Sequence, residues 1–135
     1  RVLTGGGMWG VEDYYNLAFD VYFKDEKVGR VVLRGNTLVE NICYFDWKNF
    51  ERPWGKYPLI LMRSGEAVRS WLADRVVPED RANIGEILSV YGLKEYNVYR
   101  LCEKTHGTMI GSANWIKFDH IPDDGKTWEE IRPRD

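Results

Sequence analysis

Residues 16–24, with the sequence NLAFDVYFK, decide the fold class, because large apolar side chains recur at every second position. Successive side chains of a β-strand point to opposite faces, so Leu17, Phe19, Val21 and Phe23 would share one face. The stretch therefore predicts a half-buried strand, with that face in the core.

Two more strands are predicted directly after this one, at 28–33 and 38–45. The first of them is rich in valine, and the polar stretches 25–27 and 35–36 separate the strands as turns do. Short polar connections favour antiparallel neighbours, so this part of the chain predicts an antiparallel meander built from hairpins.

From Ser64 onward the spacing of the apolar residues changes to that of a helix. Ser64 is a good N-cap residue, and Val68, Trp71 and Leu72 follow it at helical spacing. A second helix is predicted from Pro78, because proline and the two acids that follow it favour a first helical turn.

The clearest helical stripe of the chain lies in this second helix and consists of Ile84, Ile87, Leu88 and Tyr91. Gly92 would end the helix. A third helix is predicted over 94–105, followed by Gly107, and a short strand or edge segment over 115–118. Strands followed by helices indicate an α+β fold: an N-terminal antiparallel meander, about three short helices and a short final strand.

The length of 135 residues suits one domain, and 44% hydrophobic residues are typical of a globular chain. Residues 1–7, RVLTGGG, have no core-forming pattern and are predicted to be a linker, which leaves 8–135 as a single α+β domain. The 19 basic and 21 acidic residues give a net charge of -2, which argues against binding nucleic acid by bulk charge.

The two cysteines, Cys43 and Cys102, are predicted to be small buried hydrophobic residues of a cytoplasmic protein. The chain has no Asn-x-Ser/Thr sequon and no apolar run of the length of a secretion signal or a membrane span. A disulfide between the two cysteines stays open at this point, because sequence alone does not give their separation.

The best candidate for a functional surface is the loop 44–57, in which six of fourteen residues are aromatic. Tryptophan, tyrosine and arginine dominate the energetics of protein interfaces, so this loop is predicted to bind a partner protein. The alternative is that the aromatic side chains form a lid packed on the sheet. The predicted contact residues are Trp47, Lys48, Phe50, Arg52, Trp54 and Tyr57.

Arg75 and Arg81 flank the predicted start of the second helix, close to Glu79. One interpretation is a contact with an anion or with nucleic acid. The favoured interpretation is an ion-pair network that fixes the corner between two helices.

Cys102 and His106 are four residues apart at the end of the third predicted helix, so both could face one ligand. A tetrahedral metal site would also need Cys43 and His120, which nothing in the sequence brings close. The favoured interpretation is a buried cysteine and a histidine at a helix C-terminus. No phosphate-binding loop or nucleophile motif occurs, so no catalytic residue, metal or cofactor is predicted.

A set of residues between 70 and 116 carries a resemblance to a known family. These residues are Trp71, Leu72, Arg75, Pro78, Arg81, Ile84, Leu88, Tyr91, Gly92, Leu93, Glu103, Gly107, Ser112, Trp115 and Ile116. Their pattern resembles the region ahead of the kinase domain in HipA-like proteins of Firmicutes. The front strands, Phe19 to Leu33 with Val28 and Gly29, look loosely like the strand-rich start of the same proteins.

HipA-like proteins resemble the toxin kinases of toxin–antitoxin systems, and their kinase chemistry lies in a later domain. The resemblance therefore implies a stand-alone relative of a non-catalytic module. Small proteins of this kind in phages and mobile elements often bind a host protein, as anti-CRISPR inhibitors do.

These observations predict a small, non-enzymatic, cytoplasmic protein-binding module, which would act as an inhibitor of a host protein such as a CRISPR nuclease. A nucleic-acid-associated regulator or toxin–antitoxin component is the first alternative. A small enzyme that uses Cys102, His106 or His120 is the second.

Overall fold

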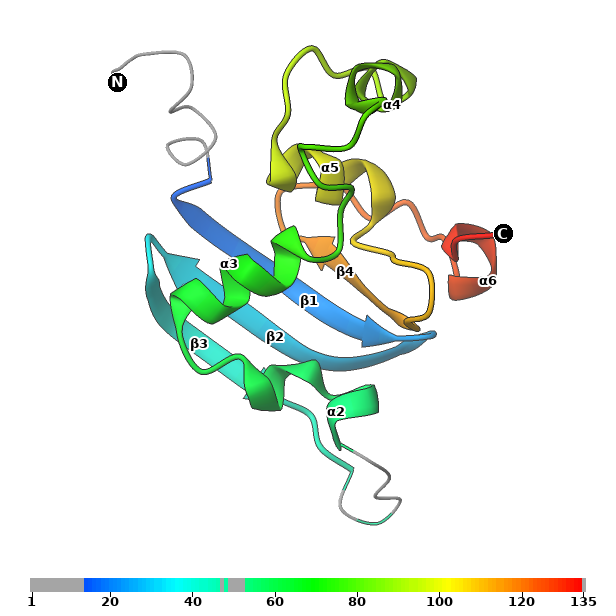
Figure 1. Ribbon diagram of the computed structural model, residues 1–135. Helices are drawn as coiled ribbons and strands as arrows, with labels where there is room; N and C mark the ends of the chain where they lie inside the picture. The colour runs from blue at the N-terminus through cyan, green and yellow to red at the C-terminus, as the bar shows by residue number, and fades with distance from the viewer. Residues whose placement is uncertain (1–13, 47, 49–52, 135) are drawn as a thin grey trace.

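The alternating stretch at the start of the domain forms the first strand of a four-stranded antiparallel sheet, which confirms the predicted α+β class (Figure 1). The computed structural model describes residues 14–46, 48 and 53–134. Along the sheet the strands follow the order β3-β2-β1-β4. They span Asn16–Phe23 (β1), Glu26–Arg34 (β2), Thr37–Cys43 (β3) and Asn114–Phe118 (β4).

β4 pairs with β1, although 90 residues separate the two strands along the chain. Phe19 lies opposite Phe118, and Val21 lies opposite Ile116. The sequence predicts a short strand here and gives no partner for it. The pairing closes the domain, because the last strand completes the sheet that the N-terminal meander begins.

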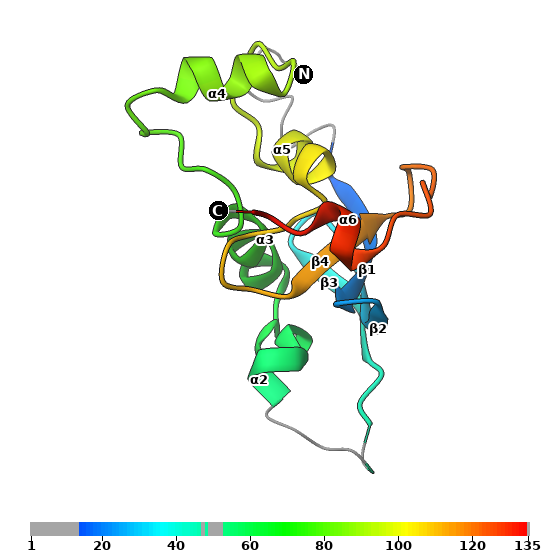
Figure 2. The same cartoon turned by 90° about the vertical axis from the view of Figure 1, so that its right-hand side faces the viewer.

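The helices are short, and α2 and α3 lie on one side of the sheet (Figures 1 and 2). α3 crosses this inner face, and α4 stands away from the sheet in both views. The helices are α2 (Pro53–Lys56), the 3-10 turn η2 (Pro58–Leu61), α3 (Gly65–Ala73), α4 (Ile84–Val90), α5 (Val98–Thr105) and α6 (Trp128–Ile131).

α3 begins where the sequence predicts, because Ser64 Oγ accepts a hydrogen bond from the Ala67 backbone at 3.0 Å. Val68 and Leu72 are buried and pack in the core between α3 and the sheet. The first helical residue is Gly65, whose backbone lies against the carbonyl of Asn36. A Cβ at Gly65 would lie 2.2 Å from the Asn36 oxygen, so only glycine lets the helix start this close to the β2–β3 turn.

The second and third helices start later than predicted. Pro78 opens a turn instead of a helix, because Arg81 donates to the Pro78 carbonyl at 3.2 Å, three residues back. Ile84 repeats this spacing onto the Arg81 carbonyl, so α4 starts only there. α5 starts at Val98, because the Asn97 side chain accepts from the backbone amides of Tyr99 and Arg100 at 2.9 and 3.1 Å.

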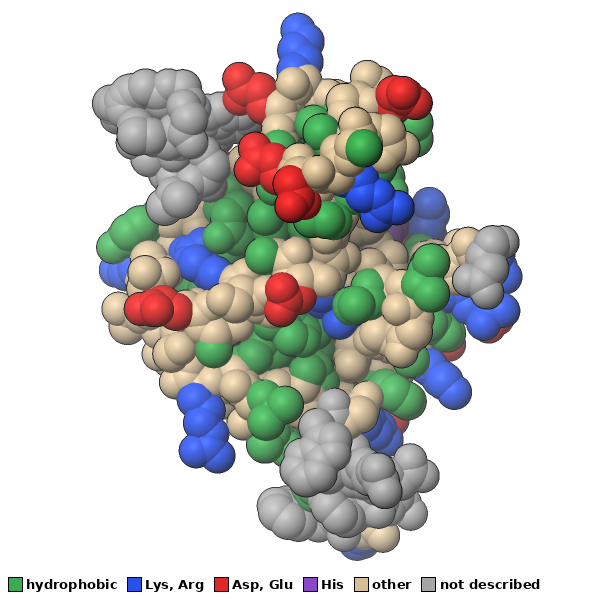
Figure 3. Space-filling view, in the orientation of Figure 1, with side chains coloured by type: hydrophobic (Ala, Val, Ile, Leu, Met, Phe, Trp, Pro, Cys, Tyr) green, Lys and Arg blue, Asp and Glu red, His purple; other side chains and the backbone are tan. Residues whose placement is uncertain are grey.

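The core lies between the inner face of the sheet and α3, and Figure 3 shows hydrophobic side chains on either side of this helix. The outer face of the sheet instead carries Arg30, which pairs with Asp20 on β1 and Glu40 on β3. No helix among the described residues is long and apolar enough to cross a membrane. The main core residues are Leu17, Phe19, Val21, Val28, Val31, Leu33, Leu59, Met62, Val68, Leu72, Ile116 and Phe118.

Candidate functional site

Most of the predicted aromatic contact surface lies outside the described residues. Trp47, Phe50 and Arg52 belong to this part, and of Trp54 the structure describes only the helical backbone in α2. Lys48 is exposed, and its backbone donates to Asp46 Oδ1 at 3.0 Å. The partner-binding role of these five residues remains a prediction.

Tyr57 does not belong to an exposed contact surface, so its predicted role is wrong. Its side chain is buried, and its ring lies 4.8 Å from that of Phe45. Its hydroxyl accepts a hydrogen bond from the Asp46 backbone at 3.1 Å. Tyr57 therefore ties the two ends of the aromatic loop together, and at this end of the loop the lid interpretation describes the packing.

Among the described strands, β3, which leads into this loop, lies at the edge of the sheet and pairs only with β2. Three apolar side chains at this edge are exposed: Val39 at 59%, Ile42 at 41% and Tyr44 at 43%. We call the free edge of β3 together with these three side chains the β3 surface. The predicted strand is confirmed here, but the exposure of its apolar residues was not predicted.

Edge strands expose unpaired backbone groups, and proteins commonly guard them with lysine, proline or covering segments. The β3 sequence TLVENIC contains neither lysine nor proline. A bulge at Val39 disturbs the pairing with β2, but the steps from Glu40 to Cys43 are regular. The opposite edge, β4, is covered, because the Ile116 backbone donates to the His106 carbonyl at 2.9 Å. Within the described part of the chain no strand pairs with the β3 edge, and the Asn41 side chain on this strand donates to the Leu59 and Met62 carbonyls at 3.1 and 2.7 Å.

Arg75 does not form the predicted anion or nucleic-acid contact, because its side chain is buried. Its guanidinium donates to the Gly107 carbonyl at 2.6 Å and to the Asn114 carbonyl at 2.7 Å. Burial lowers its pKa to about 10. The favoured interpretation, an ion-pair network, is also wrong for Arg75, because its hydrogen-bond partners are two backbone carbonyls and the Ser112 hydroxyl.

Arg81 is exposed in the turn ahead of α4, and its backbone takes part in that turn. Since Arg75 is buried, the two arginines do not form one basic surface. An anion contact through Arg81 stays a prediction, to which the buried side chain of Arg75 does not contribute.

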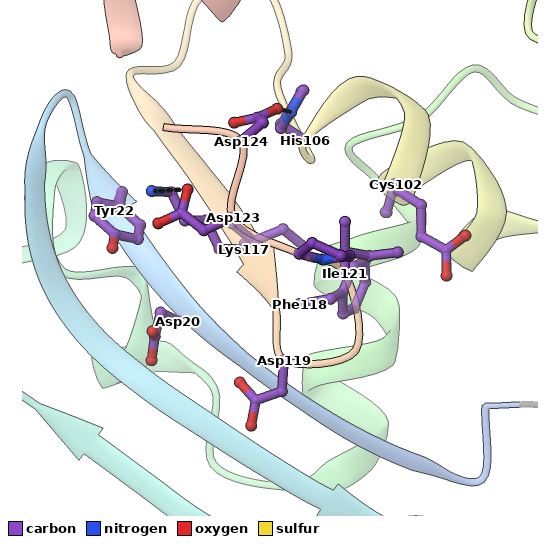
Figure 4. A pocket seen from close by; sticks show the side chains of 13 residues that line it. Asp20, Tyr22, Cys102, His106, Lys117, Phe118, Asp119, Ile121, Asp123 and Asp124 are labelled. Atoms are coloured by element: carbon purple, nitrogen blue, oxygen red, sulfur yellow. Dashed lines mark hydrogen bonds and ion pairs between the residues drawn. The ribbon is translucent and has the colours of Figure 1, made fainter. Parts of the chain in front are cut away.

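A cavity of about 320 Å³ lies between α5, the outer side of β4 and residues 119–125 (Figure 4). Cys102 and His106 both line it, as the spacing of four predicts, and so do Lys117, Asp123 and Asp124. His106 Nε2 lies 3.3 Å from Asp124 Oδ2, and Lys117 Nζ lies 3.1 Å from Asp123 Oδ1. Neither aspartate was predicted, and the local signal for them is the turn sequence around Gly125.

The cavity does not assemble the metal site that the sequence leaves open. Cys43 lies on β3, and two strands separate β3 from β4, so Cys43 is far from the cavity. Among the described residues no group of three histidine, cysteine or acidic side chains is placed to hold a metal ion. Both cysteines are free, and burial raises the pKa of the Cys102 thiol to about 12. That pKa disfavours Cys102 as a nucleophile.

Comparisons of the chain with protein-family models, with curated proteins and with solved structures found no match.

Proposed function

We propose that this protein is a non-enzymatic protein-binding module that binds its partner through the β3 surface. The observation that carries this proposal is an edge strand without lysine or proline, beside which Val39, Ile42 and Tyr44 are exposed. An extended segment of a partner can add to such an edge through main-chain hydrogen bonds, and side chains beside the edge then select the sequence.

A partner strand would pair with the regular part of β3, Glu40–Cys43. Ile42 would offer it apolar contact area, and Glu40 would favour a basic residue opposite. Arg30 Nε lies 3.5 Å from Glu40 Oε1 and already supplies one cation to this carboxylate. A basic partner residue would therefore add modestly to affinity and mainly to the choice of register.

The charge of Glu40 also argues that the partner is a different protein. Two copies of β3 paired antiparallel about their centres would place Glu40 opposite its own copy. Like charges directly opposite each other in a sheet are destabilising. This repulsion disfavours the register centred on Glu40 for two copies of the chain, and a host or cognate protein is the partner of this proposal.

The aromatic loop follows β3 directly, so it would extend the same surface. Trp47, Lys48, Phe50, Arg52 and Trp54 stay in the proposal as contacts beyond Tyr44. Tyr57 leaves the contact set, because it is buried.

The structural observations favour binding over the two alternative functions. Arg75 is buried and therefore cannot contribute to a nucleic-acid contact. A cysteine enzyme would depend on the Cys102 thiol, whose pKa is about 12. The likeness to the non-catalytic region of HipA-like proteins points in the same direction. An inhibitor of a host protein, encoded by a phage or a mobile element, is the form of this function that the likeness suggests.

Affinity capture with matched variants tests the proposal. The wild type, Ile42→Glu and Val90→Glu are immobilised and exposed to a bacterial lysate, and captured proteins are quantified by mass spectrometry. Val90 is the control, because it is apolar, 83% exposed and carried by α4 rather than the sheet. We expect a protein that the wild type and Val90→Glu retain and that Ile42→Glu loses at least about tenfold. Equal retention by Ile42→Glu, or no retained protein, would contradict the proposal.

A further inference from the structure

Two residues of β3, Asn41 and Cys43, direct their backbone N–H and C=O groups away from β2. The Tyr44 backbone donates to the Val28 carbonyl at 2.9 Å, which makes these two residues a hydrogen-bonded pair. Hydrogen-bonded and non-hydrogen-bonded pairs alternate along antiparallel strands, so Ile42 also directs its backbone groups to β2. The residue on either side of Ile42 therefore directs its groups to the free edge, where a further strand could bond to them.

These edge groups have no other use in the part of the chain that the structure describes. Neither Asn41 nor Cys43 forms a backbone hydrogen bond with a described residue outside the sheet, and Asn41 is exposed. A row of free N–H and C=O groups at a sheet edge is a template for an extended segment, which can present matching groups at the same spacing. The backbone of β3 thus determines that the occupant of this edge is an extended chain.

On the outer face of the sheet, Ile42 would lie at the centre of the added pairing. It lies between the two edge-directed residues and is 41% exposed. Relative to an added antiparallel strand, Ile42 belongs to a non-hydrogen-bonded pair, in which opposite side chains approach most closely. An apolar side chain opposite Ile42 would therefore be the main contact on this face.

On the inner face, the 3-10 turn η2 supplies a second apolar side chain beside β3. Asn41 lies opposite Val31 of the core, and its Nδ2 donates to the Leu59 and Met62 carbonyls at 3.1 and 2.7 Å. Leu59 and Met62 are buried, whereas Leu61 in the same turn is 63% exposed. Residues three apart in a 3-10 turn share one side, so Leu61 points to another side than these two. The turn thus holds an uncovered leucine next to the inner side of the edge strand.

We infer that the partner supplies one extended segment that pairs with the backbone of Asn41 and Cys43 and carries apolar side chains on both of its faces. One apolar residue contacts Ile42 on the outer face, and its neighbour in the segment, opposite Asn41, contacts Leu61 on the inner face. The residue after that lies opposite Glu40, where a basic side chain fits. A segment antiparallel to β3 therefore has the order apolar, apolar, basic, and a parallel segment has the reverse order. Consecutive apolar residues are typical of strands that are buried on both faces.

This inference rests on the proposed function, because both use the β3 surface. It adds the backbone groups that the partner uses and the chemistry of the partner segment. The two can fail separately, since Ile42 tests the surface, whereas the N–H of Cys43 and the side chain of Leu61 test the pairing.

Selection from a phage-displayed library of random decapeptides on the immobilised full chain tests the inference. Enriched peptides are counted by sequencing, and the same selection on Ile42→Glu is the reference. We expect the order apolar, apolar, basic, in one direction or the other, to be at least about fivefold more frequent among peptides selected on the wild type.

Matched variants then separate strand pairing from other contacts, with the affinity of one selected peptide measured by fluorescence anisotropy. Cys43→Pro removes an N–H that β2 does not use, and the outward side of an edge strand tolerates proline. Cys43→Ala keeps this N–H and is its matched reference, so Cys43→Pro should bind the peptide at least about tenfold more weakly than Cys43→Ala does. Leu61→Glu should weaken binding of the wild-type peptide by about five- to tenfold.

Amide exchange measured by NMR gives a second test, which decides the matter if Cys43→Pro does not fold. In the wild type, the peptide should slow the exchange of the Asn41 and Cys43 amides and leave that of Ile42 unchanged. A peptide that requires Ile42 but binds Cys43→Pro like Cys43→Ala, binds Leu61→Glu like the wild type, or protects neither edge amide would overturn this inference and leave the proposed function standing. No enrichment on the wild type over Ile42→Glu would overturn both.

Discussion

The guanidinium of Arg75 lies 4.5 Å from the ring centre of Trp71, and both residues belong to the C-terminal end of α3 and the turn after it. With one face on this ring, the guanidinium donates to the Gly107 and Asn114 carbonyls. A single buried cation therefore connects α3 to both ends of the segment between α5 and β4. Its role in the structure is to hold this segment in place.

Replacement of Arg75 should destabilise the fold strongly. We expect Arg75→Ala to lower the free energy of unfolding by about 2–4 kcal/mol, because buried carbonyls lose their donors and Trp71 loses its cation. Urea unfolding measures this change. Arg81→Ala, at an exposed position, is the control and should change the stability by less than about 0.5 kcal/mol. Equal effects of the two variants would show that Arg75 does not have this role.

Arg75 also shows why sequence reasoning gave an incomplete account of the site. An arginine after a helix with an acid nearby predicts an exposed ion pair, and the local sequence supports that interpretation. The actual partners are carbonyls 32 and 39 residues away along the chain. The packing of the loop after α5 brings these carbonyls to the guanidinium. Every residue has a backbone carbonyl, so the sequence does not show which carbonyls will accept a hydrogen bond from Arg75.

Two glycines in helices should respond to alanine in opposite directions. At Gly65 a Cβ would lie 2.2 Å from the Asn36 oxygen, so Gly65→Ala must push α3 away from the β2–β3 turn. At Gly85 in α4 nothing lies within 4 Å, so Gly85→Ala should stabilise by about 0.5–1 kcal/mol through helix propensity. We expect thermal unfolding to show a lower melting temperature for the first variant and a higher one for the second. Equal shifts for both would contradict the close approach at Gly65.

The pair between Arg30 and Asp119 should contribute to stability at neutral pH and not in strong acid. Hydrogen bonds from Arg30 lower the pKa of Asp119 in the folded protein. A carboxyl with a lowered pKa stabilises the fold fully above its unfolded pKa of about 4, and the contribution is lost as the pH falls through the folded value. Asp119→Asn should therefore be less stable than the wild type at pH 7, by less than about 1 kcal/mol because the pair is partly exposed. Urea unfolding at pH 7 and pH 2.5 checks this, and a difference that persists at pH 2.5 would rule out the ion pair as its cause.

The two thiols should differ in reactivity. Burial raises the pKa of both, but Cys102 is fully buried with a pKa of about 12, whereas Cys43 is half-buried on the edge strand. A disulfide reagent at pH 8 should label Cys43 first, at a rate at least about tenfold higher, and Cys102 mainly when the domain opens. Mass spectrometry of the labelled peptides identifies the order. Faster labelling of Cys102 would show an exposed or activated thiol and would revive the enzyme interpretation.

Local sequence patterns predicted most of the strands and helices. The features that they did not predict depend on contacts between segments that are far apart in the chain. The alternation from Leu17 to Val21 gave β1 its buried face, and Ser64 gave the start of α3. The position of β4 beside β1 follows from the packing of the whole chain. The burial of Tyr57 also follows from packing. Its place in the aromatic loop predicted an exposed side chain, but its ring packs against Phe45 and is buried.

The central claim, partner binding through the β3 surface, is tested most directly by photocrosslinking from single positions. A photoreactive phenylalanine analogue is placed at Ile42 in one variant and at Val90 in another, both on exposed apolar sites of the same domain. After irradiation in a bacterial lysate, the account predicts that position 42 forms a covalent adduct with one protein, which competes away with excess wild type. Position 90 should not form that adduct. An adduct from position 90 alone, or none from position 42, would contradict binding through the β3 surface.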